Sequence, residues 1–244
     1  MLVIAHRGAS ALAPENTIAA FNKAIEAKAD AIEFDVVQVG QEIYVFHDRY
    51  LERLTAQPGR FVDLTKEQIN KLSIFGQHPI PTLAETLQCI GNHCGVNIEI
   101  KGTVDTSLLV DNIQHAIQNF NIDPAQLIVS SFNHHWLNSV KAKAPQIKIG
   151  ALTSNCLVDY AKCAADLGAY SFHVDVNFIC DELVKDAHAR GLKVFVYTVD
   201  EPHDMHWLAE LGVDGIFTNH PLFARNVLEN RPTSGNEVFG RFQP

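Results

Sequence analysis

Three carboxylates stand where the sequence predicts the interior of a β-sheet. Glu33 and Asp35 alternate with apolar residues in the segment 31–38, and Glu99 is flanked on both sides by isoleucine. Residues two apart in a strand share a face, with Cα atoms roughly 7 Å apart. Buried like charges repel each other and lose hydration, which costs several kcal/mol or raises a pKa. Because all-oxygen ligands suit a hard cation, we predict that these three residues hold Mg²⁺ or Ca²⁺. Solvated acids on a surface strand are the alternative.

Two histidines end separate apolar runs. His6 follows the run 2–5, and His47 follows the run 43–46. A single histidine in such a place is more often a packed or capping residue. Two of them in register with three carboxylates fit a general acid and a general base. We therefore predict that His6 and His47 are catalytic.

Two cations stand beside these residues. Arg7 directly follows His6, and Lys101 lies two residues after Glu99 on the same predicted face. A guanidinium and an ammonium near a divalent ion form a clamp for phosphate. We predict that Arg7 and Lys101 bind phosphate, although Lys101 could instead be a structural ion-pair partner of one of the acids.

Two further residues are candidates for the substrate site. His173 lies within an apolar run, and Tyr197 comes late in another. Both positions are close to the carboxyl ends of predicted strands. We predict that His173 and Tyr197 line the mouth of the site, and plain packing is the alternative.

Short apolar runs alternate along the chain with segments of helical periodicity. The predicted strands are 2–5, 31–38, 96–100, 127–130, 147–152, 169–174, 193–198 and 214–217. The predicted helices are 17–28, 82–91, 106–120, 134–143, 157–167, 180–190, 203–211 and 221–228. Eight strands alternating with eight helices, most strands too apolar to be half exposed, predict a closed parallel sheet. We therefore expect residues 1–228 to form one α/β domain, a TIM (β/α)₈ barrel.

Two internal segments and the end of the chain depart from this alternation. Residues 38–47 are predicted to form a hairpin, and residues 48–81 a small insertion with a short helix at 65–72. We expect this insertion to be too short for an independent core and to lie over the barrel mouth. Residues 229–244 are expected to be an irregular C-terminal tail.

Composition excludes some classes of partner. A formal net charge of −9 argues against nucleic acid or an anionic membrane. No apolar stretch approaches the length of a membrane span, so we expect no stable membrane association. Five cysteines without a Cys-x-x-Cys pair indicate free thiols in a reducing compartment, and hence a cytoplasmic protein. A homodimer is compatible with the sequence.

The motifs along the chain, taken in order, resemble those of the glycerophosphodiester phosphodiesterase family. They are His6-Arg7-Gly8, Pro14-Glu15-Asn16-Thr17, Glu33-Phe34-Asp35, His47-Asp48, Ile80-Pro81-Thr82-Leu83, Asn97-Ile98-Glu99-Ile100-Lys101, Ser130-Ser131-Phe132, Tyr197-Thr198-Val199 and Gly212-Val213-Asp214-Gly215-Ile216. Each motif is weak by itself, but the ordered set is highly specific. The resemblance extends over nearly the whole chain and leaves out only the tail.

The resemblance implies a metal-dependent TIM-barrel enzyme. Its substrates would be glycerophosphodiesters such as glycerophosphocholine or glycerophosphoethanolamine, cleaved to glycerol 3-phosphate and an alcohol. The metal ligands of the family match the three carboxylates, its acid and base match the two histidines, and its phosphate-binding positions match Arg7 and Lys101. The segment 48–81 matches an insertion that helps to shape the glycerol pocket.

One position departs from the family pattern. Near the last strand the family often has Thr-Asp-x-Pro, whereas this chain has Thr218-Asn219-His220-Pro221. Because an amide carries no charge, an electrostatic role there is in doubt, and we expect Asn219 to cap the following helix.

Two other functions stay open on the sequence. The same chemistry could act on a lysophospholipid, which would require an apolar groove and usually a membrane anchor. A non-catalytic phosphodiester-binding protein would be expected to have lost a catalytic residue or a metal ligand, and every such position is present.

Overall fold

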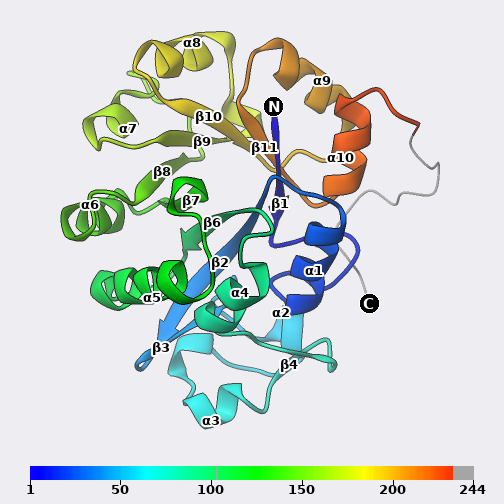
Figure 1. Cartoon of the computed structure of the whole chain (residues 1–244), viewed down its shortest axis with the longest axis vertical. Coiled ribbons are helices and arrows are strands. Elements are labelled where there is room, and N and C mark those ends of the chain that lie inside the picture. The colour runs from blue at the N-terminus through cyan, green and yellow to red at the C-terminus, as the bar shows by residue number, and fades with distance from the viewer. Residues whose placement is uncertain (103, 233–244) are drawn as a thin grey trace.

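The computed structural model describes residues 1–102 and 104–232. Eight parallel strands form the barrel: β1 (Leu2–His6), β2 (Ala31–Val39), β6 (Gly95–Ile100), β7 (Leu127–Ser131), β8 (Lys148–Thr153), β9 (Ser171–Asp175), β10 (Lys193–Tyr197) and β11 (Gly215–Thr218). Strand β1 pairs with both β2 and β11, which closes the sheet. The predicted TIM barrel is therefore confirmed (Figure 1).

The barrel strands are surrounded by helices. These are α1 (Ile18–Glu26), α4 (Leu83–Ile90), α5 (Thr106–Asn119), α6 (His134–Lys143), α7 (Lys162–Asp166), α8 (Asp181–Ala189), α9 (Pro202–Glu210) and α10 (Pro221–Leu228). One predicted helix, 157–167, is too long, since α7 begins only at Lys162. Tyr160 has a φ of 44°, which is incompatible with a right-handed helix, so the chain turns there before α7 starts.

Local sequence signals account for several helix ends. The side chain of Thr82 accepts a hydrogen bond from the Glu85 backbone, and Glu85 bonds back to Thr82, which completes the expected capping box of α4. Beyond the last residues of α7, α8 and α9, Gly168, Gly191 and Gly212 have φ values of 67°, 79° and 80°. Glycine adopts this left-handed conformation without steric cost, so each helix ends where the sequence predicts.

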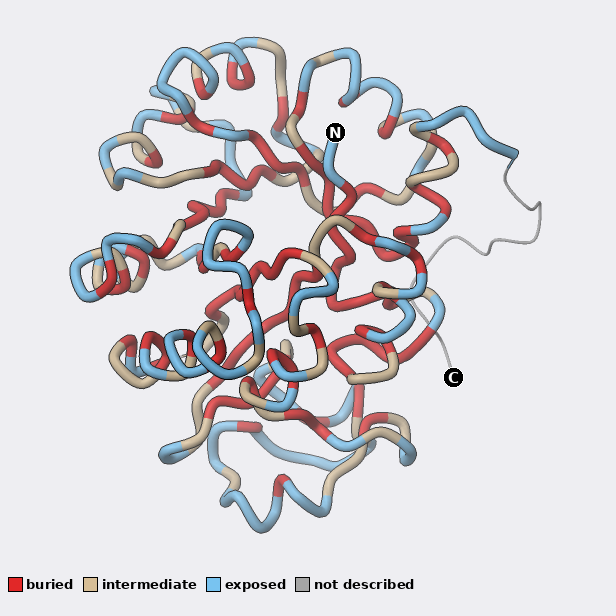
Figure 2. The backbone as a smooth tube through the Cα atoms, viewed as in Figure 1, coloured by how far each residue is buried: buried red, intermediate tan, exposed pale blue. Residues whose placement is uncertain are grey.

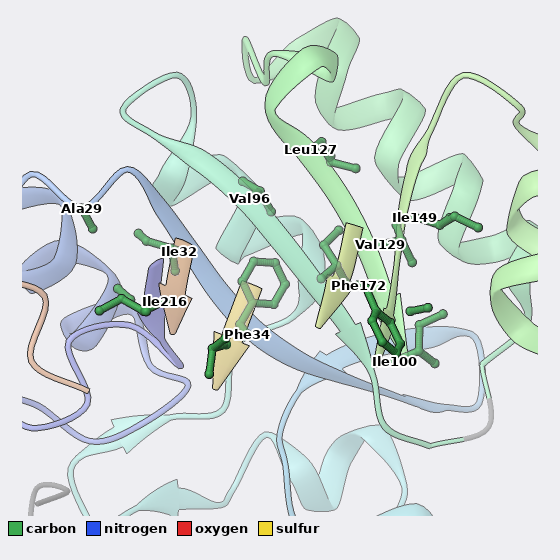
Figure 3. Close-up of a cluster of buried hydrophobic side chains, with 14 of the residues drawn as sticks. Ala29, Ile32, Phe34, Val96, Ile100, Leu127, Val129, Ile149, Phe172 and Ile216 are labelled. Carbon is green, nitrogen blue, oxygen red and sulfur yellow. The ribbon is translucent and has the colours of Figure 1, made fainter. Parts of the chain in front are cut away.

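The main core lies between the outer face of the barrel and the helix layer. Buried residues follow the strands and the inner faces of the helices, while the outer helix surfaces are exposed (Figure 2). On β2, Ile32 and Phe34 belong to this layer together with Val96 of β6 and Phe172 of β9 (Figure 3). Because side chains alternate along a strand, the residues between them must point into the barrel.

The predicted hairpin is present, and the insertion after it contains short elements. Strand β3 (Glu42–Val45) pairs antiparallel with β2. The chain then forms α2 (Glu52–Thr55), the 3₁₀ helix η1 (Phe61–Asp63), α3 (Lys66–Ile69), β4 (Ser73–Ile74) and β5 (His78–Pro79). Two further 3₁₀ turns, η2 (Pro124–Gln126) and η3 (Val176–Phe178), lie within the barrel connections.

Residues 48–81 share a small core with the hairpin rather than forming an independent one. A second cluster of buried side chains forms here: Val37, Tyr44, Phe46, Leu51, Leu54, Phe61, Ile69, Ile74 and Ile80. The rings of Phe46 and Phe61 stack with their centroids 4.4 Å apart. The hairpin contributes its own aromatic residues, so the insertion and the hairpin together bury enough apolar surface for a small second core beyond β3 (Figure 1).

The two remaining fold predictions concern the membrane and the tail. Among the described helices, none combines the length and the apolar character that crossing a membrane requires. Helix α10 ends at Leu228. Most of the predicted tail, residues 233–244, lies outside the described part of the chain.

Candidate active site

The strand register brings the three predicted metal ligands together. Across β2 and β6, Glu33 pairs with Asn97 and Asp35 pairs with Glu99. The three carboxylates are buried, and each offers an oxygen within 4.8 Å of the oxygens of the other two. They form one cluster at the carboxyl ends of two neighbouring barrel strands.

This cluster contains buried oxygens with no hydrogen-bond donor. Within the described residues, no donor lies within hydrogen-bond distance of Glu33 Oε1 or Asn97 Oδ1, and Asp35 Oδ1 has Lys101 Nζ at 3.6 Å. A buried polar atom without a partner is costly, and a bound cation would remove that cost. Because the donor set consists only of oxygens, the cluster fits a hard divalent cation such as Mg²⁺ or Ca²⁺. Asn97, which the sequence analysis did not select, could have been found from its alternation with Glu99.

Without a bound cation, burial and mutual repulsion disfavour ionisation of all three carboxylates at once. Burial and the charges of Asp35 and Glu99 raise the pKa of Glu33. Burial and the charge of Asp35 raise the pKa of Glu99 to about 7. Burial also acts on Asp35, but the positive charges of Arg7 and Lys101 outweigh it and lower the Asp35 pKa. Negative charge is therefore concentrated on Asp35 in the metal-free protein.

Arg7 contacts two of these carboxylates through separate groups. Its backbone N–H donates to Glu33 Oε2 at 2.9 Å, and its Nε lies 3.2 Å from Asp35 Oδ2. Arg7 has a φ of 59° and Gly8 one of 81°. A Cβ atom at Gly8 would lie 2.7 Å from the Ala20 backbone, so this turn at the end of β1 requires glycine.

Lys101 lies on the other side of the cluster. Its Nζ is 2.6 Å from Glu99 Oε1 and 3.6 Å from Asp35 Oδ1. These ion pairs fit the structural alternative from the sequence. Lys101 also lines the active-site cavity, so phosphate binding by Lys101 stays a prediction. A cation bound by the carboxylates would leave Lys101 available to an anion.

His6 is held by a chain of hydrogen bonds that starts at Asp200. His6 Nδ1 donates to Asn219 Oδ1 at 2.9 Å, and Asn219 Nδ2 donates to Asp200 Oδ2 at 2.6 Å. Since the Asn219 amide nitrogen points to Asp200, its oxygen must accept, and His6 Nδ1 must carry the hydrogen. The expected capping role of Asn219 was wrong: His220 is the N-cap residue of α10, and Asn219 instead orients His6.

His47 is held by a second network, which reaches Arg7. His47 Nδ1 donates to Asp48 Oδ1 at 2.7 Å. The Arg53 guanidinium donates to both oxygens of Asp48, at 2.6 and 2.9 Å, and to both oxygens of Glu15, at 2.7 and 2.8 Å. Glu15 in turn accepts from Arg7 Nη1 at 2.6 Å. Arg53 thus connects the predicted catalytic histidine with a predicted phosphate ligand.

Three adjoining cavities share Lys101 at this end of the barrel. The active-site cavity, of about 360 Å³, is lined by Lys101 and by most of the predicted site residues: His6, Arg7, Glu33, Glu99, His173 and Tyr197. His47 lines two neighbouring cavities, of about 380 and 500 Å³, and Lys101 lines all three. The structure therefore places the two histidines in different cavities on either side of Lys101.

His173 and Tyr197 lie in different environments within the active-site cavity. His173 is fully buried, with its ring against Phe195 and Phe217, and burial lowers its pKa to about 3. Its imidazole is therefore neutral and packs like a core residue. The Tyr197 hydroxyl donates to the Thr153 carbonyl at 2.7 Å, and Tyr197 is one of the residues that line the cavity.

Known proteins resemble this chain over almost its full length. A family model described as the glycerophosphoryl diester phosphodiesterase family matches residues 6–222. A glycerophosphodiester phosphodiesterase of Caldanaerobacter subterraneus subsp. tengcongensis is 42% identical over 230 residues, covering 90% of this chain and 94% of that protein. Another, from Bacillus subtilis, is 30% identical over 251 residues, covering 91% and 84%. The structure of an Oleispira antarctica phosphodiesterase in complex with the product sn-glycerol-3-phosphate has a TM-score of 0.86 at 28% identity, covering 94% and 97%.

Proposed function

Because the chain belongs to the glycerophosphoryl diester phosphodiesterase family, a family of phosphoric diester hydrolases, we propose that it hydrolyses small glycerophosphodiesters with the aid of a divalent metal ion. The products would be glycerol 3-phosphate and an alcohol. The observation that carries the proposal is the buried cluster of Glu33, Asp35 and Glu99, whose oxygens converge beside two cations. Glycerophosphocholine and glycerophosphoethanolamine are candidate substrates.

The three carboxylates and the two cations have separate tasks in this reaction. Glu33, Asp35 and Glu99 would hold Mg²⁺ or Ca²⁺, which supplies positive charge that polarises the phosphate and the attacking group. Arg7 and Lys101, on either side of the carboxylates, offset the negative charge that develops on the phosphate oxygens. The buried position of Arg7 strengthens this effect, since less water screens its charge.

The two histidines supply the proton transfers. Nδ1 of each histidine is engaged, in His6 by Asn219 and in His47 by Asp48, so Nε2 is the nitrogen that would transfer the proton. One accepts a proton from the nucleophile and the other donates a proton to the leaving alcohol. The nucleophile is either water or the 2-hydroxyl of the glycerol unit.

Alanine variants test these roles. We expect His6→Ala and His47→Ala each to lower kcat by about two to four orders of magnitude, the usual contribution of a general acid or base. Metal binding, measured by calorimetry, should persist because neither histidine belongs to the carboxylate cluster. His203→Ala is the matched control, since this side chain is 95% exposed on α9. Full turnover by either active-site variant would remove that histidine from the mechanism.

The site gives no reason to prefer a non-catalytic role, because every catalytic and metal-binding position of the family pattern is present. We further propose that the protein works in the cytoplasm, which agrees with its five free cysteines. A homodimer stays a prediction.

A further inference from the structure

Asn16 is a fully buried residue beside the carboxylate cluster, in the loop between β1 and α1. Its φ of 59° lies in the left-handed region, which asparagine tolerates better than most residues do. A buried amide needs hydrogen-bond partners, because an unpaired polar group in the interior costs free energy. The partners of Asn16 belong to the active site.

Three hydrogen bonds connect Asn16 with the ends of β1 and β2. Its side-chain Nδ2 donates to Asp35 Oδ2 at 2.8 Å, and its Oδ1 accepts from the Asp35 backbone N–H at 3.3 Å. Its own backbone N–H donates to the Arg7 carbonyl at 3.0 Å. Because the Asp35 N–H can only donate, the amide oxygen must face it, and this directs the amide nitrogen toward the Asp35 carboxylate.

The two oxygens of the Asp35 carboxylate have different surroundings. Oδ2 accepts from Asn16 Nδ2, and Arg7 Nε lies 3.2 Å from it. Oδ1 has no donor within hydrogen-bond distance among the described residues, since Lys101 Nζ is 3.6 Å away. The same Nζ contacts Glu99 Oε1 at 2.6 Å, which places Oδ1 toward Glu99. One oxygen is thus engaged by the protein, and the other is left for a cation.

We propose that Asn16 is a positioning residue: by engaging Asp35 Oδ2 it leaves Oδ1 for the metal ion and fixes Asp35 as a ligand through one oxygen. The inference rests on the proposed metal-dependent hydrolysis and adds a residue outside the three carboxylates that sets how tightly the metal binds. Loss of the hydrogen-bond partner of a metal ligand lowers metal affinity about 10–100-fold. A fixed carboxylate matters most for Mg²⁺, which requires near-ideal octahedral geometry, whereas Ca²⁺ accepts one or both oxygens of a carboxylate.

Two substitutions separate the amide from the turn that carries it. Asn16→Gly and Asn16→Ala both remove the two side-chain hydrogen bonds, but glycine adopts a φ of 59° freely and alanine does not. Asn121→Gly is the matched control. Asn121 also has a φ of 59°, but it is exposed and lies between α5 and β7, at the opposite end of the barrel. Circular dichroism establishes that each variant is folded.

Calorimetric titration of the chelator-treated proteins gives the Kd of Mg²⁺ and of Ca²⁺. We expect Asn16→Gly and Asn16→Ala to raise the Kd of Mg²⁺ equally, by at least about tenfold, because both lose the amide. The Kd of Ca²⁺ should rise less, since this ion tolerates a carboxylate that can rotate. Asn121→Gly should leave both constants unchanged.

Infrared difference spectra of the wild-type protein provide a measurement that needs no variant. Asp35 is the one aspartate in the carboxylate cluster, so ¹³C labelling of aspartate separates its signal from those of Glu33 and Glu99. Coordination through one oxygen widens the separation between the two carboxylate stretching bands, and coordination through both oxygens narrows it. We expect the wider separation when Mg²⁺ is added.

The outcomes distinguish the positioning role from the reaction itself. An unchanged Kd of Mg²⁺ in Asn16→Gly, even with a raised Kd in Asn16→Ala, would overturn the inference, because Asn16 would then serve the turn alone. A narrowed band separation in the wild type would overturn it as well. Both results would leave the proposed function standing. A folded wild-type protein that binds neither metal would overturn the proposed metal-dependent function, and the inference with it.

Discussion

The Asn219 side-chain amide acts as both a hydrogen-bond donor and a hydrogen-bond acceptor. Its nitrogen donates to Asp200, and its oxygen accepts from His6 and from Ser10, at 2.9 and 2.7 Å. An aspartate at position 219 would place a carboxylate oxygen where the amide nitrogen now lies, 2.6 Å from Asp200 Oδ2. The carboxylate of Asp200 therefore requires a hydrogen-bond donor at position 219, which the asparagine amide provides.

This complementarity predicts the result of exchanging the two groups. Asn219→Asp alone should lower the free energy of unfolding by about 1–3 kcal/mol and reduce kcat, because two carboxylates would face each other at hydrogen-bond distance. The double variant Asp200→Asn with Asn219→Asp restores one donor and one acceptor, so it should recover most of both losses. Urea unfolding and kcat of the wild type, Asn219→Asp, Asp200→Asn and the double variant form a double-mutant cycle. Strictly additive effects would contradict the pairing.

The sequence predicted some of these residues because their signal is local. Glu33 and Asp35 alternate with apolar neighbours, and this period of two places them inside the barrel from the pattern alone. The partner of Asn219 gives no such signal. Asp200 lies 19 residues earlier, after β10, and meets Asn219 only when the barrel closes. A short polar residue two positions before Pro221 therefore indicated a helix cap, although its true partners are distant in sequence.

At the scale of elements, the short helix α2 joins the insertion to the active site. Its Arg53 side chain is 42% exposed, yet it donates hydrogen bonds to both Asp48 and Glu15. Through these two acids it fixes the orientation of His47 and of Arg7. The insertion therefore acts on the site as a positioning element as well as a cover for the second core.

Removing this arginine should lower activity without unfolding the protein. We expect Arg53→Ala to reduce kcat/KM at least about tenfold, since a hydrogen bond to a charged group contributes roughly 1.5–3 kcal/mol. Arg53→Lys should recover only part of the activity, because an ammonium cannot bind two carboxylates with paired hydrogen bonds. Lys66→Ala is the control: Lys66 lies in the same insertion, and the change removes its ion pair with Glu42 of β3. Equal kinetics for Arg53→Ala and Lys66→Ala would contradict the positioning role.

The elements of the barrel could be predicted more fully than the insertion. Apolar runs and helical periodicity alternate in a fixed order, and the period of each segment depends on local geometry. The second core could not be recognised in this way, because Tyr44 and Phe46 belong to the hairpin and Phe61 to the insertion. Which face of the hairpin these rings would cover depends on tertiary contacts. Similarly, the pattern of apolar residues in 157–167 does not indicate the positive φ of Tyr160, after which α7 begins.

At the scale of the whole molecule, the carboxylate cluster makes the stability of the metal-free protein depend on pH. Burial and the charge of Asp35 raise the pKa of Glu99 from 4.5 to about 7, and the pKa of Glu33 is raised as well. Between pH 4.5 and about pH 7, Glu99 in the folded protein keeps a proton that Glu99 in the unfolded chain has lost. The free energy of unfolding must therefore fall as the pH rises through this window.

Thermal unfolding in the presence of a chelator tests this effect. The Tm of metal-free protein should decrease from pH 5 to pH 7.5, and Glu99→Gln should flatten the decrease because it removes one titrating group. Adding Mg²⁺ or Ca²⁺ at 100 times its Kd should stabilise the protein by about 2.7 kcal/mol, since the metal binds the folded state. A Tm that rises over this range, with a slope that Glu99→Gln leaves unchanged, would contradict the proposed electrostatics of the cluster.

The central claim is that a metal ion held by the three carboxylates supports hydrolysis of a glycerophosphodiester. The most direct test measures release of glycerol 3-phosphate from glycerophosphoglycerol, whose alcohol is uncharged, by chelator-treated protein with and without Mg²⁺ or Ca²⁺. We predict release only with metal, and none above background from Glu33→Ala under the same conditions. Equal release without metal, or full activity of the Glu33→Ala variant, would contradict this account of the site.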